Sequence, residues 1–168
     1  MIVTVRVDDR LIHGQVALLW TKKLQADGII VANDAAANNE TQQMTLKMVA
    51  PYNVKLTIKS LSDAVQLLNN PKAKKMRIFV LVNSIKDALA LVKELNEANL
   101  TVNIANAGRF DGEDIAGKLN LTKTVLVSDS ELENLKALVA SDNEIILQTL
   151  PDEPIKKAAD LLKSHNKL

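Results

Sequence analysis

The chain has 168 residues, of which 47% are hydrophobic and only 2% aromatic, with 21 basic and 20 acidic residues. This length and composition exclude a disordered tail and predict one domain, residues 1–168, with an aliphatic core. The absence of cysteine excludes disulfide frameworks and thiolate metal sites, and the balanced charge argues against nucleic acid as a partner.

The N-terminal sequence does not resemble a targeting segment. Residues 1–6 lack a basic region followed by a long apolar stretch, so we expect no signal peptide. Apolar runs such as Phe79-Val80-Leu81-Val82 are much shorter than a membrane span requires. We therefore expect a soluble, cytoplasmic protein.

Short β-branched runs alternate along the chain with amphipathic segments of about one helix length. Strands are expected at residues 2–7, 29–32, 54–58, 77–82, 101–104, 124–127 and 144–147. Helices are expected at residues 14–25, 39–50, 60–68 (capped by Ser60 or Ser62), 84–95, 130–139 and 152–162. The run 77–82 is the most apolar and is expected to be central in the sheet. The alternation predicts an α/β fold with three layers, in which helices cover both faces of a mostly parallel, twisted sheet.

The loop after the first strand concentrates residues suited to chemistry. Ligands bind beyond the carboxyl ends of parallel strands, and this loop brings Asp8, Asp9, Arg10 and His13 to that edge. A helix dipole opposes positive charge at the helix start, which favours the neutral, nucleophilic form of the His13 imidazole. A phosphoryl dianion on that ring would instead be attracted by the dipole and the free backbone N–H groups.

The neighbours of His13 suit the same chemistry. Arg10 can offer a planar fork to phosphoryl oxygens, and Gly14 lets backbone approach without a Cβ. Either Asp8 or Asp9 can hold the imidazole tautomer or orient Arg10, and the sequence does not separate these roles.

Each of these features also has a purely structural interpretation. A histidine at a helix start is often a cap or a surface residue, and an Asp-Arg pair is often a surface salt bridge. Asn33 and Asp34 end a strand at the same edge, where they also suit a turn. Arg109 lies in the glycine-bearing loop 105–117 and can reach a ligand or remain solvated. Two further residues are expected to be structural or neutral, namely Trp20 in the core and His165 in the Lys-rich tail.

No cofactor is expected. The chain has no phosphate-loop lysine motif, no dinucleotide-type glycine triplet after the first strand and no histidine pair at metal spacing. A protein of this kind that handles phosphate needs neither a nucleotide nor a metal of its own.

The run VRVDDRLIHGQV from Val5 to Val16, with Trp20 downstream, resembles the signature of the IIB component of the mannose/fructose/sorbose family of the bacterial phosphotransferase system. The similarity extends over nearly the whole chain. Further matching segments are Ile30-Val31-Ala32-Asn33-Asp34, Met48-Val49-Ala50-Pro51, Val102-Asn103-Ile104, Thr122-Lys123-Thr124-Val125 and Leu150-Pro151.

The resemblance implies a mechanism and a set of partners. A phosphohistidine of the IIA component donates to His13, at Nδ1, and Arg10 binds the phosphoryl group. The loaded domain then docks on the membrane IIC/IID permease and phosphorylates the sugar. Gly14, Gln15, Asn33, Asp34 and Arg109 are expected in the loops that meet substrate or partner. The family fold also implies an antiparallel edge strand.

Two departures from the family pattern stand out. Many members have Gly-Gly after the fifth strand, where this chain has Ala105-Asn106-Ala107-Gly108-Arg109, and many have an arginine where it has Gln148. The second phosphoryl-binding arginine is therefore open, with Arg109, Arg6 or none in that role. Asn33-Asp34, Gln42-Gln43 and Gln148 are more similar to members serving N-acetylgalactosamine or related amino sugars.

Two alternatives remain at the level of sequence. The first is a regulatory or binding module of the same fold, which would be phosphorylated at His13 without passing the group to sugar. The second is a nucleotide-dependent enzyme, which is disfavoured because the sequence has no phosphate-binding loop motif. The oligomeric state is open, and a homo-oligomer is compatible with the sequence.

Overall fold

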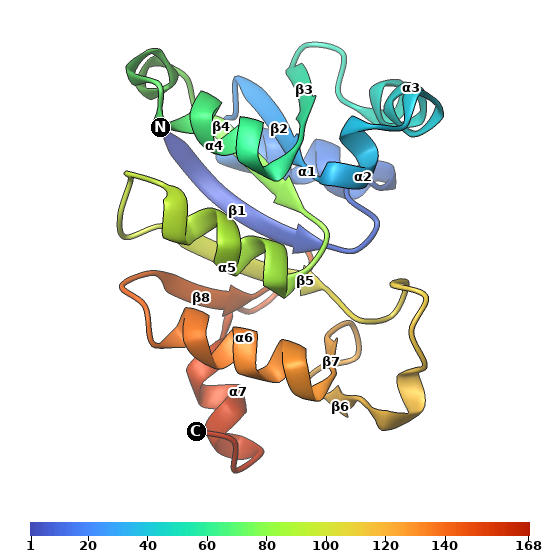
Figure 1. Cartoon of the computed structure of the whole chain (residues 1–168), viewed down its shortest axis with the longest axis vertical. Helices are drawn as coiled ribbons and strands as arrows, with labels where there is room; N and C mark the ends of the chain where they lie inside the picture. Colours follow the sequence, from blue (N-terminus) through green and yellow to red (C-terminus); the bar gives the residue numbers. More distant parts are fainter.

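The computed structural model describes residues 1–168, apart from the side chain of Gln15. Its main sheet has seven strands in the order β3-β2-β4-β1-β5-β8-β9 (Figure 1). The strand bounds are β1 Ile2–Asp8, β2 Gly28–Ala32, β3 Lys55–Lys59, β4 Ile78–Val82, β5 Thr101–Asn106, β8 Glu144–Leu147 and β9 Lys156–Lys157. Every neighbouring pair is parallel except β8 and β9, which are antiparallel at one edge. The expected α/β fold with an antiparallel edge strand is confirmed.

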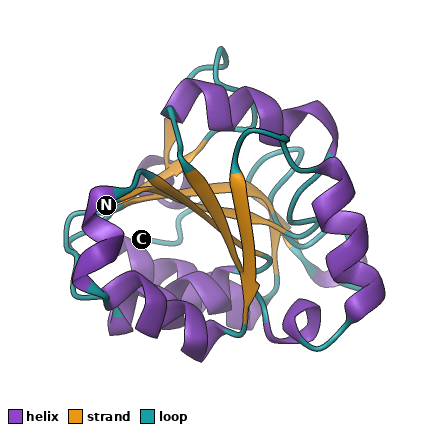
Figure 2. Cartoon of the chain, turned by 90° about the horizontal axis from the view of Figure 1, so that it is seen from above, coloured by secondary structure: helices purple, strands orange, loops and turns teal.

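Helices cover both faces of the twisted sheet (Figure 2). Their bounds are α1 Gly14–Leu24, α2 Asp34–Ala37, α3 Glu40–Val49, α4 Leu61–Asn69, α5 Ile85–Glu94, α6 Asp129–Val139 and α7 Ala158–Ser164, with short 3₁₀ turns at Pro71–Lys75 and Ile115–Gly117. One apolar core contains buried residues of α4, α5, α6 and α7, and the other contains residues of α1, α2 and α3. In Figure 1, α5 and α6 lie in front of the sheet and α1 lies behind it.

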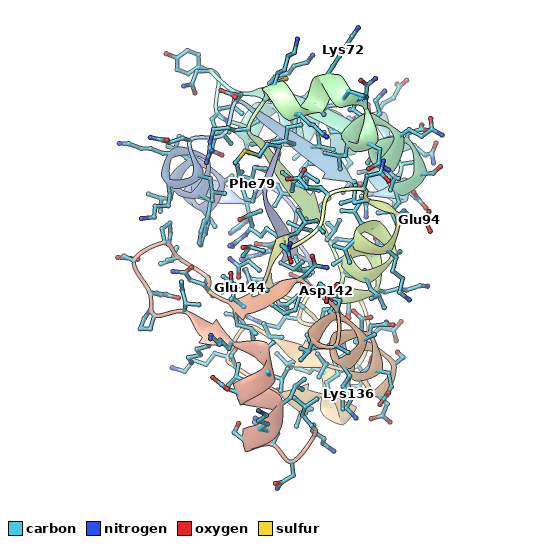
Figure 3. All side chains as sticks on the ribbon, turned by 90° about the vertical axis from the view of Figure 1, so that its left-hand side faces the viewer. Lys72, Phe79, Glu94, Lys136, Asp142 and Glu144 are labelled. Atoms are coloured by element: carbon cyan, nitrogen blue, oxygen red, sulfur yellow. The ribbon has the colours of Figure 1, made fainter. Side chains whose placement is uncertain are left out.

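The period of two along β4 explains the two cores. Ile78, Val80 and Val82 face one core, while Phe79 and Leu81 face the other. β4 is therefore buried on both sides between β2 and β1, as its apolar sequence predicts. Figure 3 shows Phe79 in the interior, whereas Lys72 and Glu94 lie at the periphery.

The caps of several helices agree with the sequence. The hydroxyl of Ser60 accepts a hydrogen bond from the N–H of Asp63, so Ser60 rather than Ser62 caps α4. Ser84 caps α5 in the same way. α3 ends at Val49, two residues before Pro51.

Two expectations about local structure are wrong. The run 124–127 is not a full strand of the main sheet. Only β7 (Leu126–Val127) forms, and it pairs with β6 (Leu119–Asn120) in a separate antiparallel ribbon. The run meets the chain after β5 at a single bridge, in which Ala107 exchanges backbone hydrogen bonds with Thr124 and Leu126. The last helix begins at Ala158 rather than near residue 152, because Lys156 and Lys157 pair with β8 and form the edge strand β9.

The segment after β2 contains a short helix that was not among the expected ones. Residues 34–37 form the short helix α2, because the side-chain oxygen of Asn33 accepts a hydrogen bond from the N–H of Ala36 at 2.8 Å.

The strand order places a switch point between β1 and β5. The chain leaves β1 toward β2 on one side, and it leaves β5 toward β8 on the other. The loops after β1 and β5 therefore diverge, and ligands bind at such a point in open parallel sheets. None of the helices in the described residues combines the length and apolar composition needed to cross a bilayer.

Candidate functional site

His13 stands between the end of β1 and the start of α1. It is the N-cap residue of α1, with extended backbone, and its exposed side chain makes no capping hydrogen bond. The first N–H groups of a helix have no partner within the helix, and the dipole is positive there. An exposed imidazole at this position is accessible to a partner protein, and a dianion on it would be stabilised.

The two residues before His13 anchor the loop. Leu11 and Ile12 are only 4% and 5% exposed and belong to the core that contains α1. Leu11 has φ 57°, an unfavourable value for a residue with a Cβ, and its N–H donates to the carbonyl of Asp8 at 2.8 Å. Burial of this side chain offsets the backbone strain, and the tight turn leaves His13 in solvent.

Asp8 connects the loop to the sheet. Its Oδ1 accepts a hydrogen bond from the backbone N–H of Arg10 at 3.0 Å and lies 3.7 Å from Arg10 Nε. Its Oδ2 accepts from Asn106 Nδ2 at 3.1 Å and pairs with Arg6 at 3.4 Å. Of the roles left open for Asp8, these contacts support orientation of Arg10.

Arg6 lies beneath the loop and is buried. Its guanidinium donates to the carbonyls of Gln148 and Thr149 and lies 5.4 Å from the centroid of the Trp20 ring. Burial lowers the pKa of Arg6 to about 10, against the opposing effect of Asp8. A guanidinium with these partners is a structural group in the interior rather than a surface anion receptor.

Asp9 holds the loop that follows β5. Its Oδ2 accepts hydrogen bonds from two consecutive backbone N–H groups, those of Arg109 at 3.1 Å and Phe110 at 3.0 Å. The N–H of Asp9 donates to the carbonyl of Asn106 at 3.0 Å. Among the described contacts, none joins Asp8 or Asp9 to the His13 imidazole.

Arg10 and Arg109 meet at one aromatic ring. Their guanidinium carbons lie 5.2 Å and 5.1 Å from the centroid of Phe110, whose side chain is half-exposed. The structure thus brings Arg109, distant in sequence, to the loop that carries Arg10 and His13.

Lys118 fixes the far side of that loop. Its ammonium donates to the carbonyl of Gly108 at 2.9 Å and pairs with Asp111 at 2.8 Å. Burial raises the pKa of the Asp111 carboxyl, but the bonds from Lys118 and from the N–H of Glu113 outweigh this effect and lower it.

The remaining expected residues have different surroundings. Asn33 is buried as the cap of α2, and Asp34 Oδ1 accepts from the N–H of Leu61 at the start of α4, so both side chains serve the structural role that the sequence allows.

Gly14 has φ 50°, and a Cβ at this position would meet nothing within 4 Å, so its conformation rather than a close approach favours glycine. The side chain of Gln15 lies outside the described residues.

Two buried amides next to the site were not singled out from the sequence. Asn103 Nδ2 donates to the Gln148 carbonyl at 2.9 Å, and Asn106 donates to Asp8. The sequence of β1 indicates that polar partners are needed nearby. Thr4, Arg6 and Asp8 alternate with valines along this strand, which puts three polar side chains on one face. β5, which carries both amides, pairs with β1. Within the described residues, no three His, Asp or Glu side chains group so as to hold a metal ion.

Comparisons with known proteins agree with this geometry. A probable phosphotransferase enzyme IIB component of Streptococcus pyogenes serotype M6 is 49% identical over 152 residues, which cover 90% of this chain and 93% of that protein. The mannose-specific EIIAB component of Escherichia coli K12 is 31% identical over 162 residues, and the match covers 96% of this chain but only 48% of that longer protein.

The fold comparison gives the same result. The crystal structure of the IIB domain of the sorbose permease from Klebsiella pneumoniae superposes with a TM-score of 0.87 at 29% identity, covering 98% of this chain and 97% of that one. The family model for the sorbose-subfamily IIB component of the phosphotransferase system matches residues 2–168. The chain therefore belongs to the sorbose-subfamily IIB components of the phosphotransferase system.

Proposed function

We propose that this chain is a phosphoryl carrier in which His13 accepts a phosphoryl group from a IIA phosphohistidine and passes it to a sugar. The observation that carries the proposal is the position of His13, exposed at the start of α1 and next to the switch point between β1 and β5. Family membership supports the same role.

The two transfers are simple displacements at phosphorus. The lone pair of neutral His13 Nδ1 attacks the phosphorus, and the donor N–P bond breaks with its electron pair returning to the IIA imidazole. In the second transfer a sugar hydroxyl oxygen attacks, its proton leaves to a base, and the His13 N–P bond electrons return to the ring. Such transfers depend on positioning and charge stabilisation, which a rigid loop with Arg10 supplies.

The partners follow from the same proposal. The IIA component is the donor, and the joint EIIAB name of the Escherichia coli relative supports a IIA–IIB pairing. The acceptor is a sugar held by the IIC/IID permease, so the domain works in the cytoplasm at the membrane surface. Residues 1–168 act as one IIB domain, and no cofactor takes part. The amino-sugar assignment stays a prediction.

The test is phosphorylation with phosphoenolpyruvate, the general phosphotransferase proteins and a cognate IIA. His13→Ala should abolish acid-labile label with an unchanged circular dichroism spectrum. His165→Ala is the matched control, because His165 is the only other histidine and follows the last residue of α7. Label that persists in His13→Ala would contradict the proposal.

A second measurement separates a sugar transferase from a regulatory module. Labelled protein mixed with membranes that contain the IIC/IID permease and sugar should lose its label to sugar phosphate. Retention of the label in that mixture would identify a module that is phosphorylated but does not discharge.

A further inference from the structure

We propose that Arg109 provides a second guanidinium for the phosphoryl group on His13, and that Asp9 is the positioning residue that holds Arg109 in place. The inference rests on the proposed function and adds to it a residue from a different loop.

Two cationic side chains converge at the ring of Phe110. Arg10 and Arg109 both lie over the half-exposed ring of Phe110, at 5.2 Å and 5.1 Å from its centroid. Arg10 has a partial counter-charge in Asp8, 3.7 Å from its Nε. In the described part of the chain, no carboxylate lies within ion-pair distance of the Arg109 guanidinium. Two guanidinium groups at one ring can both offer N–H donors and positive charge to an incoming dianion.

The segment that carries Arg109 is held by contacts on both sides. Asp9 binds the N–H groups of Arg109 and Phe110, and the Lys118 ammonium binds the Gly108 carbonyl. Gly108 itself has φ 80°, and a Cβ there would lie 1.9 Å from the Leu126 carbonyl oxygen. The backbone of Arg109 is therefore fixed before any ligand arrives, which lowers the entropic cost of binding.

The side chains of Arg6 and Gln148 cannot supply this second guanidinium. The Arg6 guanidinium is 2% exposed and is bonded to Asp8 and to two backbone carbonyls. Gln148 is neutral, and its Nε2 donates to the carbonyls of Pro151 and Glu153. Arg109 is exposed and adjacent in space to Arg10 through Phe110.

The expected effect is on the equilibrium of the first transfer. Arg109 binds the phosphoryl group only when it is on His13, so its loss disfavours phospho-His13 relative to phospho-IIA. The loss of one hydrogen bond to a charged group corresponds to a change of roughly ten- to hundredfold in the equilibrium constant.

The experiment measures that constant. Wild type, Arg109→Gln and Arg109→Lys are equilibrated with radiolabelled phospho-IIA, and the ratio of the two labelled proteins is determined. Arg109→Gln should lower the equilibrium constant at least about tenfold. The constant of Arg109→Lys should lie between those of Arg109→Gln and wild type, because lysine keeps the positive charge but lacks the paired N–H donors of the guanidinium. Lys93→Gln, an exposed lysine in the last turn of α5, removes the same charge and should match wild type. Equal constants for Arg109→Gln and Lys93→Gln would overturn the inference.

The role of Asp9 needs a readout that a merely structural role would not move. In wild type, phosphorylation should shift the NMR signal of the Arg109 Nε–H. In Asp9→Ala, His13 should still accept the label, but phosphorylation should no longer shift the Arg109 Nε–H signal. A shift equal to that of wild type would overturn the role of Asp9 in positioning Arg109. If Asp9→Ala does not fold, Arg109→Gln still decides the main inference. A wild type that takes no label would instead contradict the proposed function, so the two failures are distinguishable.

Discussion

The guanidinium of Arg6 and the carboxylate of Asp8 form a buried ion pair, with Nη2 and Oδ2 3.4 Å apart and both side chains 2% exposed. The same carboxylate binds the N–H of Arg10 with its other oxygen. The pair therefore links the interior of the sheet directly to the loop that presents His13, and the geometry of that loop depends on it.

Breaking this pair should destabilise the fold strongly. Removing one member of a buried pair leaves an uncompensated charge, so we expect Arg6→Ala to lower the free energy of unfolding by about 3–5 kcal/mol. Urea denaturation followed by circular dichroism measures this difference. The double variant Arg6→Met/Asp8→Asn removes both charges and should recover part of the loss. An Arg6→Ala protein as stable as Lys93→Gln would contradict the role of the pair.

Two glycines offer a matched comparison of backbone conformation with steric contact. Gly14 and Gly108 both have positive φ, at 50° and 80°, but only Gly108 has a backbone oxygen where a Cβ would lie. We expect Gly14→Ala to cost about 1–2 kcal/mol of stability from conformation alone. Gly108→Ala should cost distinctly more, because residues 107–110 must also move away from Leu126. Thermal unfolding gives both values, and equal losses would show that the contact with Leu126 is relieved without consequence.

The single tryptophan lies beside the same network. Trp20 is 5% exposed, and its Nε1–H donates to the carbonyl of Thr149 at 2.8 Å. Trp20→Phe keeps most of the apolar contact but removes this donor, so we expect a loss of about 1–2 kcal/mol in the free energy of unfolding. Chemical denaturation followed by circular dichroism measures the change. A variant as stable as wild type would mean that the hydrogen bond makes no net contribution.

Much of the fold was predictable because local patterns and tertiary packing agree. The period of two in β4 and the serine caps of α4 and α5 specify those elements locally, and strand–helix alternation restricts the topology. The errors arose where distant contacts decide. β9 forms only because β8 offers an unpaired edge to Lys156 and Lys157. The run 124–127 meets the chain after β5 only at the bridge between Ala107 and Val125, and its last two residues pair with β6 instead.

The candidate site was predictable in part for the same reason. Residues 8–14 are contiguous, and their position after the first strand indicates the binding edge. The contact of Asp9 with the backbone of Arg109 joins residues 100 positions apart, and the residue types alone do not predict it. The separate tasks of Asp8 and Asp9 likewise follow from the partners that the fold brings to each carboxylate.

The ion pair between Asp111 and Lys118 gives a prediction for pH. Because the pKa of Asp111 is lower in the folded protein than its usual value, its stabilising contribution is complete above the unfolded pKa, about 3.9, and is lost as pH falls through the folded pKa. We expect the NMR signal of the Glu113 N–H, which donates to Asp111 Oδ1, to change with pH at a midpoint below the unfolded pKa of about 3.9. In Asp111→Asn the signal should be displaced already at neutral pH and should show no such step. A wild-type step well above pH 4 would mean that the carboxyl is not held by Lys118, and that residues 108–118 are not fixed from this side.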